Sequence, residues 1–186
     1  MGFPVAVKIE SPDVTHKTDL GGVRLGIGDE AGARAAFASI METVGGRQPG
    51  AALAGVLVQA MDREDAVELV IGLEHDPVFG MMLMLGMGGI ALEVSPDVAF
   101  RKAPVSEAEA ARMIAGLRGA DLLGPVRGRP AIDTAAVARL AAAVSAFGAA
   151  HADRVRELDL NPVRATPSGA RVVDWLLLTA DGGGGG

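Results

Sequence analysis

Two segments near the C-terminus combine the residue types that bind a hard cation. In "ELDLNP", strand alternation places Asp159 and Asn161 together on the face opposite the leucines. Asp174 interrupts the apolar run "VVDWLLL", where a carboxylate is costly unless it has a partner. Two carboxylates and an amide oxygen on one hairpin suit Mg²⁺. The alternative is the exposed polar face that many antiparallel sheets have.

Lys8 and His16 have the chemistry to handle phosphate. Lys8 lies in the strand-like "PVAVKIE", and a lysine on a rigid strand can be a fixed positive charge for a phosphate; it could also be simply exposed. His16 follows in the polar loop "SPDVTHKTDLGG". A neutral imidazole is a good nucleophile, and Asp13 or Asp19 could orient it through one ring nitrogen. The alternative is a turn histidine without a chemical role.

Two weaker signals lie in the middle of the chain. Gln59 in "GVLVQAM" and Glu68 in "AVELVIG" flank a connection that could hold adenine through backbone amides and ribose through a carboxylate. The glycine run "LGMGGIALE" could bring N–H groups close to a phosphate, although it lacks the Walker spacing and equally fits a tight hairpin turn. Glu93 and Arg101 flank this run in either a catalytic or a structural role.

The elements that must position these residues follow from periodicity and capping signals. Asp29 is expected to cap a helix over 30–44 that ends at "GGRQPG", and Ser106 with Glu109 forms a capping box for a second helix. A third helix covers 133–150. "RATPSGA" is expected to join the last two strands as a hairpin. Strands are predicted at 4–10, 23–27, 54–60, 66–73, 81–86, 90–94, 97–102, 155–160 and 171–178. This mixture predicts an α+β fold with mostly antiparallel sheets.

Composition excludes several classes of function. The 186 residues carry a net charge of −6, with 23 acidic and 17 basic residues, which argues against a nucleic-acid binder. The chain has no cysteine, so disulfides and thiolate zinc sites are excluded. No apolar run approaches the roughly 20 residues that span a bilayer, and the start lacks signal-peptide features. We therefore expect a cytoplasmic protein with no membrane partner, and a glycine tail at 181–186 without function.

Six sequence blocks together resemble a known family. They are "VAVKIESPDVTHKTDLGGVRLGI", "GVLVQAM", "ELVIGLEHDPVFG", "LGMGGIALE", "FRKAP" and "ELDLNP…VVD". Their order is similar to that in the ATP-grasp domain of NDP-forming acyl-CoA synthetases, which include the β subunit of ADP-forming acetyl-CoA synthetase and are relatives of succinyl-CoA synthetase. The resemblance covers about residues 4–178. It implies an ATP-grasp domain over 1–180, with an inner lobe at about 1–60, a second lobe at about 61–180, and the usual N-terminal part missing.

The resemblance also implies a function and roles for individual residues. The chain would be the ATP/ADP-binding, phosphoryl-transfer domain of an ADP-forming acetate–CoA ligase, with a CoA-binding domain or α subunit as partner. A phosphohistidine would relay phosphate between acyl phosphate and ADP, with Mg²⁺ bound. The implied roles are His16 as the relay, Asp159 as the acidic group next to the phosphate, Lys8 for the nucleotide phosphates, Gln59 and Met61 for adenine, Glu68 for ribose, Gly88 and Gly89 near the transferred phosphate, and Asn161 and Asp174 for Mg²⁺. The alternatives are a nucleotide-binding regulatory module of a protein acetyltransferase fusion and an inactive fragment.

Overall fold

The chain divides into two compact units. The computed structural model describes residues 2–15, 17–61, 64–89, 96–126 and 128–180. The division falls between residues 63 and 64, and we call the two parts unit 1 and unit 2. Each unit has its own cluster of buried hydrophobic residues. Within the described ranges, no helix is long and apolar enough to cross a membrane.

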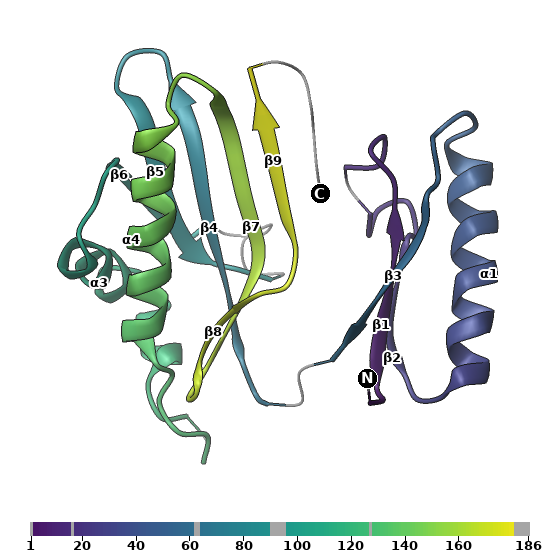
Figure 1. Ribbon diagram of the computed structural model, residues 1–186. Coiled ribbons are helices and arrows are strands. Elements are labelled where there is room, and N and C mark those ends of the chain that lie inside the picture. The colour runs from purple at the N-terminus through teal and green to yellow at the C-terminus, as the bar shows by residue number, and fades with distance from the viewer. Residues whose placement is uncertain (1, 16, 62–63, 90–95, 127, 181–186) are drawn as a thin grey trace. The chain divides into compact units, whose positions relative to one another are not determined.

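Unit 1 is a three-stranded antiparallel sheet with one helix on one face (Figure 1). Its elements are β1 (Val5–Glu10), β2 (Val23–Ile27), α1 (Glu30–Arg47) and β3 (Gly55–Ala60), with strand order β2-β1-β3. Alternate residues of β1 pack with α1: Val5, Val7 and Ile9 share a buried cluster with Ile40 and Val44. Because successive strand residues point to opposite faces, the residues between them lie on the face away from α1.

Unit 2 is built on a larger antiparallel sheet. Its strands are β4 (Val67–Asp76), β5 (Gly80–Met87), β6 (Val98–Lys102), β7 (Val155–Thr166), β8 (Gly169–Val172) and β9 (Trp175–Thr179). The order is β6-β5-β4-β7-β8, and β9 also pairs with β7. Between β6 and β7 the chain forms α3 (Glu107–Ala115), the 3-10 helix η1 (Ala120–Leu123) and α4 (Thr134–Ala150). These pairings confirm the predicted α+β fold with antiparallel sheets.

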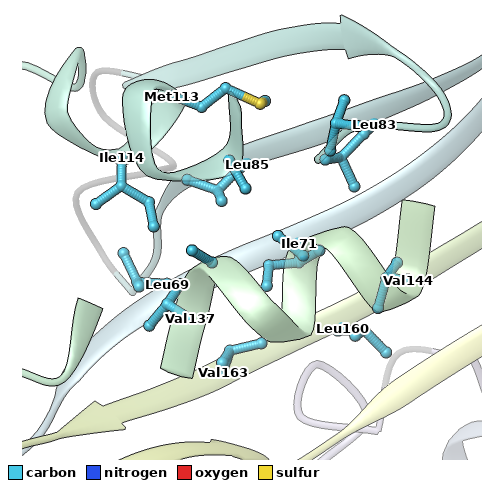
Figure 2. Close-up of a cluster of buried hydrophobic side chains, with 14 of the residues drawn as sticks. Leu69, Ile71, Leu83, Leu85, Met113, Ile114, Val137, Val144, Leu160 and Val163 are labelled. Atoms are coloured by element: carbon cyan, nitrogen blue, oxygen red, sulfur yellow. The ribbon is translucent and has the colours of Figure 1, made fainter. Parts of the chain in front are cut away.

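The core of unit 2 lies between the sheet and its helices. Figure 2 shows leucine, isoleucine and valine side chains of β4, β5 and β7 against α3 and α4. The labelled residues are Leu69, Ile71, Leu83, Leu85, Leu160 and Val163 from the strands, and Met113, Ile114, Val137 and Val144 from the helices. Since these strand residues alternate with others, Glu68, Gly72 and Glu74 lie on the face opposite the helices.

The predicted helix caps are confirmed. The Asp29 carboxylate accepts a hydrogen bond from the Gly32 N–H at 2.7 Å. Ser106 and Glu109 form the expected capping box: the Ser106 hydroxyl accepts from the Glu109 N–H, and the Glu109 carboxylate accepts from the Ser106 N–H. The Ser106 N–H and the Ser106 hydroxyl both donate to the Glu109 carboxylate, and these hydrogen bonds lower the pKa of Glu109. The starts of both helices are therefore fixed by local sequence.

Three sequence expectations about boundaries are wrong. Helix α1 continues through Gly45 and Gly46 to Arg47, because the last turn is held by the buried Val44. The predicted hairpin forms between β7 and β8, but β7 continues to Thr166, because residues 163–166 pair with β8, so most of "RATPSGA" is strand and only residues 167–168 form the turn. The predicted strand 171–178 is two strands, and Asp174 lies between them.

The glycine run after β5 also differs from a tight hairpin turn. The Met87 N–H donates to the Asp97 carbonyl oxygen at 3.0 Å, and β6 begins at Val98, so the connection between β5 and β6 covers residues 88–97. The strand predicted at 90–94 lies outside the described residues.

Candidate functional site

The phosphate-binding lysine candidate lies on the central strand of unit 1. Lys8 is buried, with 5% of its surface exposed, so the alternative of an exposed strand lysine is wrong. It is directly opposite Leu57 on β3, while Ala6 is opposite Gln59. Lys8 and Gln59 therefore share the sheet face that points away from α1. This face carries both polar candidates for nucleotide binding in unit 1, so it is the candidate nucleotide-binding surface of the unit.

Met61, the other residue implied to contact adenine, is hydrogen-bonded within unit 1 just after β3 ends. Its N–H donates to the Pro4 carbonyl oxygen at 3.0 Å, and its Sδ atom accepts from the Gly26 N–H at 2.9 Å. The Met61 backbone is therefore bonded at the start of β1, and its side chain contacts the end of β2.

The His16 loop is anchored through Asp13, while His16 itself lies outside the described residues. The Asp13 Oδ2 atom accepts from the Ala52 N–H at 2.7 Å, and the Gln48 side chain donates to the Asp13 carbonyl oxygen at 3.0 Å. These contacts tie the loop to the connection between α1 and β3. Asp13, one of the two residues suggested to orient the imidazole, thus has a structural task of its own.

Two of the three candidate residues for the cation side of the site, Asp159 and Asn161, lie on β7, and Asp174 lies between β8 and β9. The Asn161 N–H donates to the Asp174 carbonyl oxygen at 3.1 Å, which places these two residues beside each other. The Asp174 Oδ1 atom accepts from the Trp175 N–H at 3.1 Å. Asp159 is opposite Leu176 on β9 and opposite Gly72 on β4. The fold therefore brings together all three residues that the sequence assigned to this site.

A pocket of about 270 Å³ lies on the same sheet. Its lining comes from β4, β5 and β7: Val70, Gly72, Leu73, Glu74, Met84, Glu157, Leu158, Asp159 and Asn161. Glu74 and Glu157 are directly opposite each other in the pairing of β4 with β7. Like charges at such positions repel, so a cation near this pocket would reduce their repulsion.

The donor set fits a cation that keeps part of its coordination outside the protein. In the part of the chain that the structure describes, no three His, Cys, Asp or Glu side chains come close enough to enclose a metal ion. Asp159, Asn161 and Asp174 supply two carboxylates and one amide. Mg²⁺ typically binds one or two carboxylates and takes its other ligands from water and substrate phosphates. A small oxygen-donor set of this kind fits Mg²⁺ with a nucleotide.

Gly88, Gly89 and Glu68 form a third group. The Gly88 N–H donates to the Glu68 carbonyl oxygen at 2.8 Å, and a Cβ at position 88 would be 3.0 Å from the Leu69 carbonyl carbon. Gly89 has a φ of +69°, and its Cβ would be 3.0 Å from the Glu68 Oε2 atom. Both positions therefore require glycine for close approach to β4. The Gly88 N–H is thus hydrogen-bonded to the main chain of β4. The Glu68 carboxylate is exposed and lies beside Gly89.

Of the residues that line the pocket, sequence reasoning named only Asp159 and Asn161, and the missed residues include Gly72, Glu74 and Glu157. Glu157 precedes Asp159 and Asn161 at the same two-residue spacing, so alternation along the strand was a sufficient signal for it. Gly72 and Glu74 carry no comparable signal, because their position depends on the register of β4 against β7. Only the folded sheet places them beside the terminal strands.

Comparison with known proteins identifies the class. A family model for the ATP-grasp domain matches residues 1–178, and the chain therefore belongs to the ATP-grasp domain family. ADP-forming acetate–CoA ligase I of Archaeoglobus fulgidus is 42% identical over 181 residues, which cover 97% of this chain and 26% of the ligase. The β subunit of ADP-forming acetate–CoA ligase I of Pyrococcus furiosus is 36% identical over 178 residues, which cover 96% of this chain and 76% of the subunit.

The solved structures agree with this assignment. Dinucleotide-forming acetyl-coenzyme A synthetase 1 of Ca. Korarchaeum cryptofilum, in complex with coenzyme A, Ca-AMPCP and HgCl⁺, matches with a TM-score of 0.90 and 40% identity, over 96% of this chain and 77% of that chain. With coenzyme A and Mg-AMPPCP, its phosphohistidine segment points towards the nucleotide binding site; that structure matches with a TM-score of 0.79 and 37% identity, over the same shares of both chains. These comparisons confirm the predicted resemblance. The chain spans about a quarter of the Archaeoglobus ligase and about three quarters of the Pyrococcus subunit.

Proposed function

We propose that this chain is the nucleotide-binding and phosphoryl-transfer domain of an ADP-forming acyl-CoA synthetase that acts on acetate. The observation that carries the proposal is the pocket lined by Asp159 and Asn161, with Asp174 on the neighbouring segment. Its oxygen donors suit Mg²⁺ bound to a nucleotide phosphate. The similarity to a synthetase solved with Mg-AMPPCP supports the same assignment.

The proposed binding roles divide between the two units. In unit 1, Lys8 provides a fixed positive charge for the phosphates, and the backbone near Gln59 and Met61 contacts adenine. In unit 2, Glu68 accepts hydrogen bonds from ribose, and Gly88 and Gly89 allow close approach to the transferred phosphate. Asn161 and Asp174 would hold Mg²⁺, with Asp159 beside them. Bound Mg²⁺ would neutralise charge on the phosphate oxygens.

The proposed reaction passes through His16. A ring nitrogen attacks the phosphorus of a phosphohistidine on the CoA-binding part, so that a new P–N bond forms as the donor's P–N bond breaks and the donor imidazole leaves with its electron pair. A terminal phosphate oxygen of ADP then attacks the same phosphorus, and the imidazole leaves with its electron pair. The donor phosphate derives from an acyl phosphate and reaches His16 from a CoA-binding domain or an α subunit.

A phosphorylation experiment tests the relay. The chain is incubated with Mg²⁺ and γ-labelled ATP, and we expect a label that is labile to acid and stable to base. His16→Asn should abolish it. His151→Asn is the matched control, because His151 lies at the end of α4 and its Nδ1 atom is within hydrogen-bond distance of the Phe147 carbonyl oxygen. Equal labelling of wild type and His16→Asn would rule out the relay.

Calorimetric titration with Mg²⁺ and ADP tests the binding part separately. Lys8→Met should weaken ADP binding by about tenfold or more, because hydrogen bonds to charged groups contribute about 1.5–3 kcal/mol. Lys102→Met, at an exposed position of β6, is the control and should bind normally. ADP binding without any phosphohistidine would favour the regulatory module over the catalytic domain.

A further inference from the structure

One row of paired residues crosses the face of the unit 2 sheet opposite α3 and α4. Its members are Phe100 of β6, Met84 of β5, Gly72 of β4, Asp159 of β7 and Leu176 of β9, each directly opposite the next. They share this face because they alternate with residues that pack against the helices. Gly72 is the member of the row that has no side chain. The row therefore has a gap between the Met84 thioether and the Asp159 carboxylate.

The pocket of unit 2 lies at this gap. Met84, Gly72 and Asp159 all line it, and Asn161 follows on the same strand as Asp159. Gly72 contributes only main-chain atoms to the lining. The gap is thus the part of the pocket next to the residues proposed to bind Mg²⁺.

The surrounding structure does not require a glycine at position 72. Its φ lies outside the left-handed region that favours glycine. A Cβ would be 3.2 Å from Met84 Cε, the far end of a flexible side chain, and 3.6 Å from the Leu158 carbonyl oxygen. Gly86 on β5 is different, because its Cβ would be 2.6 Å from Val98 Cγ1. Packing therefore explains the glycine of β5 but not the glycine of β4.

A glycine inside a strand has a cost for the sheet. It loses more backbone entropy on folding than other residues, and it provides no side chain to pack on the pleated surface. A strand glycine without a packing reason often marks the close approach of a ligand to the main chain. The pocket supplies such a reason for Gly72.

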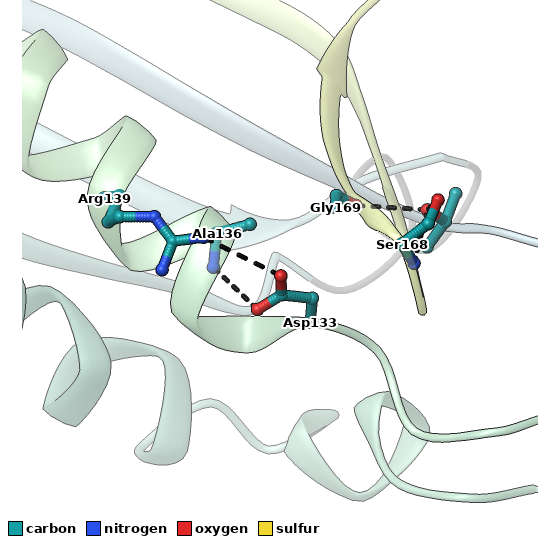
Figure 3. A network of polar contacts seen from close by, with 6 residues as sticks. Asp133, Ala136, Arg139, Ser168 and Gly169 are labelled. Carbon is teal, nitrogen blue, oxygen red and sulfur yellow. Dashed lines mark hydrogen bonds and ion pairs between the residues drawn. The ribbon is translucent and has the colours of Figure 1, made fainter.

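The gap is held open by the body of unit 2. β4 is paired with β5 on one side and with β7 on the other at positions 71–73. β7 is also attached to α4, because the Asp133 N–H donates to the Thr166 carbonyl oxygen at 3.0 Å. The Asp133 carboxylate accepts from the Ala136 N–H at 2.9 Å and pairs with Arg139 at 3.7 Å, as Figure 3 shows beside the turn at Ser168. The gap could close only if these strands left their present contacts.

The charge of the lining indicates which ligand the gap can hold. Glu74, Glu157 and Asp159 are all carboxylates, so a phosphate without a cation would be repelled. Mg²⁺ dehydrates reluctantly and usually keeps several water ligands when it binds a protein and a nucleotide. These ligands need space beside the protein donors, and the gap provides it.

We propose that Gly72 is a specificity-determining residue, whose missing side chain leaves room for the water and phosphate ligands of Mg²⁺ beside Asp159 and Asn161. This inference rests on the proposed function, in which Asn161 and Asp174 hold Mg²⁺ bound to a nucleotide. Gly72 donates nothing to the cation. It acts through the space that it leaves in the pocket.

The test adds one methyl group to the pocket. ADP affinity is measured by calorimetry with Mg²⁺ and with EDTA, and urea unfolding is measured for each full-chain variant. Gly72→Ala should weaken ADP binding with Mg²⁺ by about tenfold, because it displaces an ordered water that is bound to a charged group. Its affinity with EDTA should equal that of wild type, and its urea midpoint should be no lower. Gly46→Ala, where a Cβ meets nothing within 4 Å, is the matched control and should bind normally.

A second variant separates filling of the gap from displacement of its neighbour. If the added methyl group acted only by pushing the Met84 side chain, Gly72→Ala combined with Met84→Ala would bind like Met84→Ala alone. We expect the double variant to stay about tenfold weaker than Met84→Ala with Mg²⁺, because the methyl group itself occupies the gap. Equal affinity of these two variants would overturn the inference.

The remaining outcomes distinguish this inference from the proposed function. An equal loss of affinity with EDTA, or in Gly46→Ala, would overturn the inference, since the methyl group would not act on the ligands of the cation. A Gly72→Ala chain that failed to fold, or unfolded at lower urea, would overturn it because packing would then require the glycine. A wild-type chain that bound no ADP, or did not respond to Mg²⁺, would reject the proposed function as well. Equal Mg²⁺-dependent binding by wild type and Gly72→Ala would reject this inference alone.

Discussion

Asp97 illustrates how a single carboxylate can hold a connection in place. Its Oδ1 and Oδ2 atoms accept from the N–H groups of Arg118 at 3.0 Å and Gly119 at 2.7 Å. Its side chain is only 14% exposed. This partial burial raises the pKa of Asp97, but the two N–H donors and the nearby Arg118 guanidinium outweigh it, so the pKa lies below its ordinary value. Asp97 thereby fixes the end of the connection that begins at Gly88.

This lowered pKa predicts a pH dependence of stability. The stabilisation from Asp97 is complete above its ordinary pKa of 3.8 and is lost as the pH falls through the lower pKa of the folded state. Asp97→Asn should lower the free energy of unfolding by about 1 kcal/mol at pH 6. Below pH 4 the free energy of unfolding of this variant should fall less steeply than that of wild type, because the variant has no carboxyl group at position 97 to protonate. Urea unfolding at pH 6, 4 and 3 measures both. Asp76 and Glu109, whose pKa values are also lowered, titrate in both proteins, so their contributions cancel in the comparison. If the free energy of unfolding fell equally steeply with pH in wild type and in Asp97→Asn, the prediction would be contradicted.

Two glycines show that the surroundings of a helix decide what each position tolerates. Gly46 lies in α1, where a Cβ would meet nothing within 4 Å. Gly148 lies in α4 against the sheet, where a Cβ would be 2.6 Å from Leu73 Cδ1 and 3.1 Å from Met81 Cγ. Alanine favours the helix equally at both positions, but only the second position is crowded.

These two positions predict opposite effects of one substitution. Gly46→Ala should raise the free energy of unfolding by about 0.5–1 kcal/mol through reduced backbone entropy. Gly148→Ala should lower it by about 1–2 kcal/mol, because overpacking against Leu73 exceeds the gain in helix propensity. Urea unfolding measures the free energy of unfolding of each variant. If both substitutions raised it, the prediction for Gly148 would be wrong, and α4 would be able to shift away from the sheet.

Most element types could be predicted from local periodicity, and the failures share one cause. Residues 163–166 carry turn-like neighbours in "RATPSGA", yet they form strand because β4 and β8 supply ladder partners on both sides. Similarly, Gly45 and Gly46 are poor helix formers, yet the helix continues because its last buried side chain packs in unit 1. In both cases tertiary contacts override intrinsic preference.

Among the residues that the structure describes, buried hydrophobic side chains form two separate clusters. Ile40 and Val44 belong to the cluster of unit 1, and Leu83 and Leu85 belong to that of unit 2. Regions with their own cores can open independently, with their own free energies. The two units are therefore expected to differ in their response to a core mutation.

Hydrogen exchange measures this independence. Ile40→Ala should cost about 2–5 kcal/mol and accelerate amide exchange in β1 and β3, while protection in β4 and β5 remains unchanged without nucleotide. Leu85→Ala should show the reverse pattern. Equal acceleration in both units by either variant would instead indicate one cooperative unfolding unit.

By itself the sequence determined the class of fold, the helix caps and the face shared by Asp159 and Asn161. These properties depend on residues close together in the chain, where helical and strand periods and capping spacings operate. The tertiary structure alone decided the pairing of Glu74 with Glu157, the anchoring of Asp13 to Ala52 and the attachment of Glu64 to Ser168. These contacts join residues far apart in the sequence, and each depends on strand register or chain path, where a shift of one residue would turn a side chain to the opposite face.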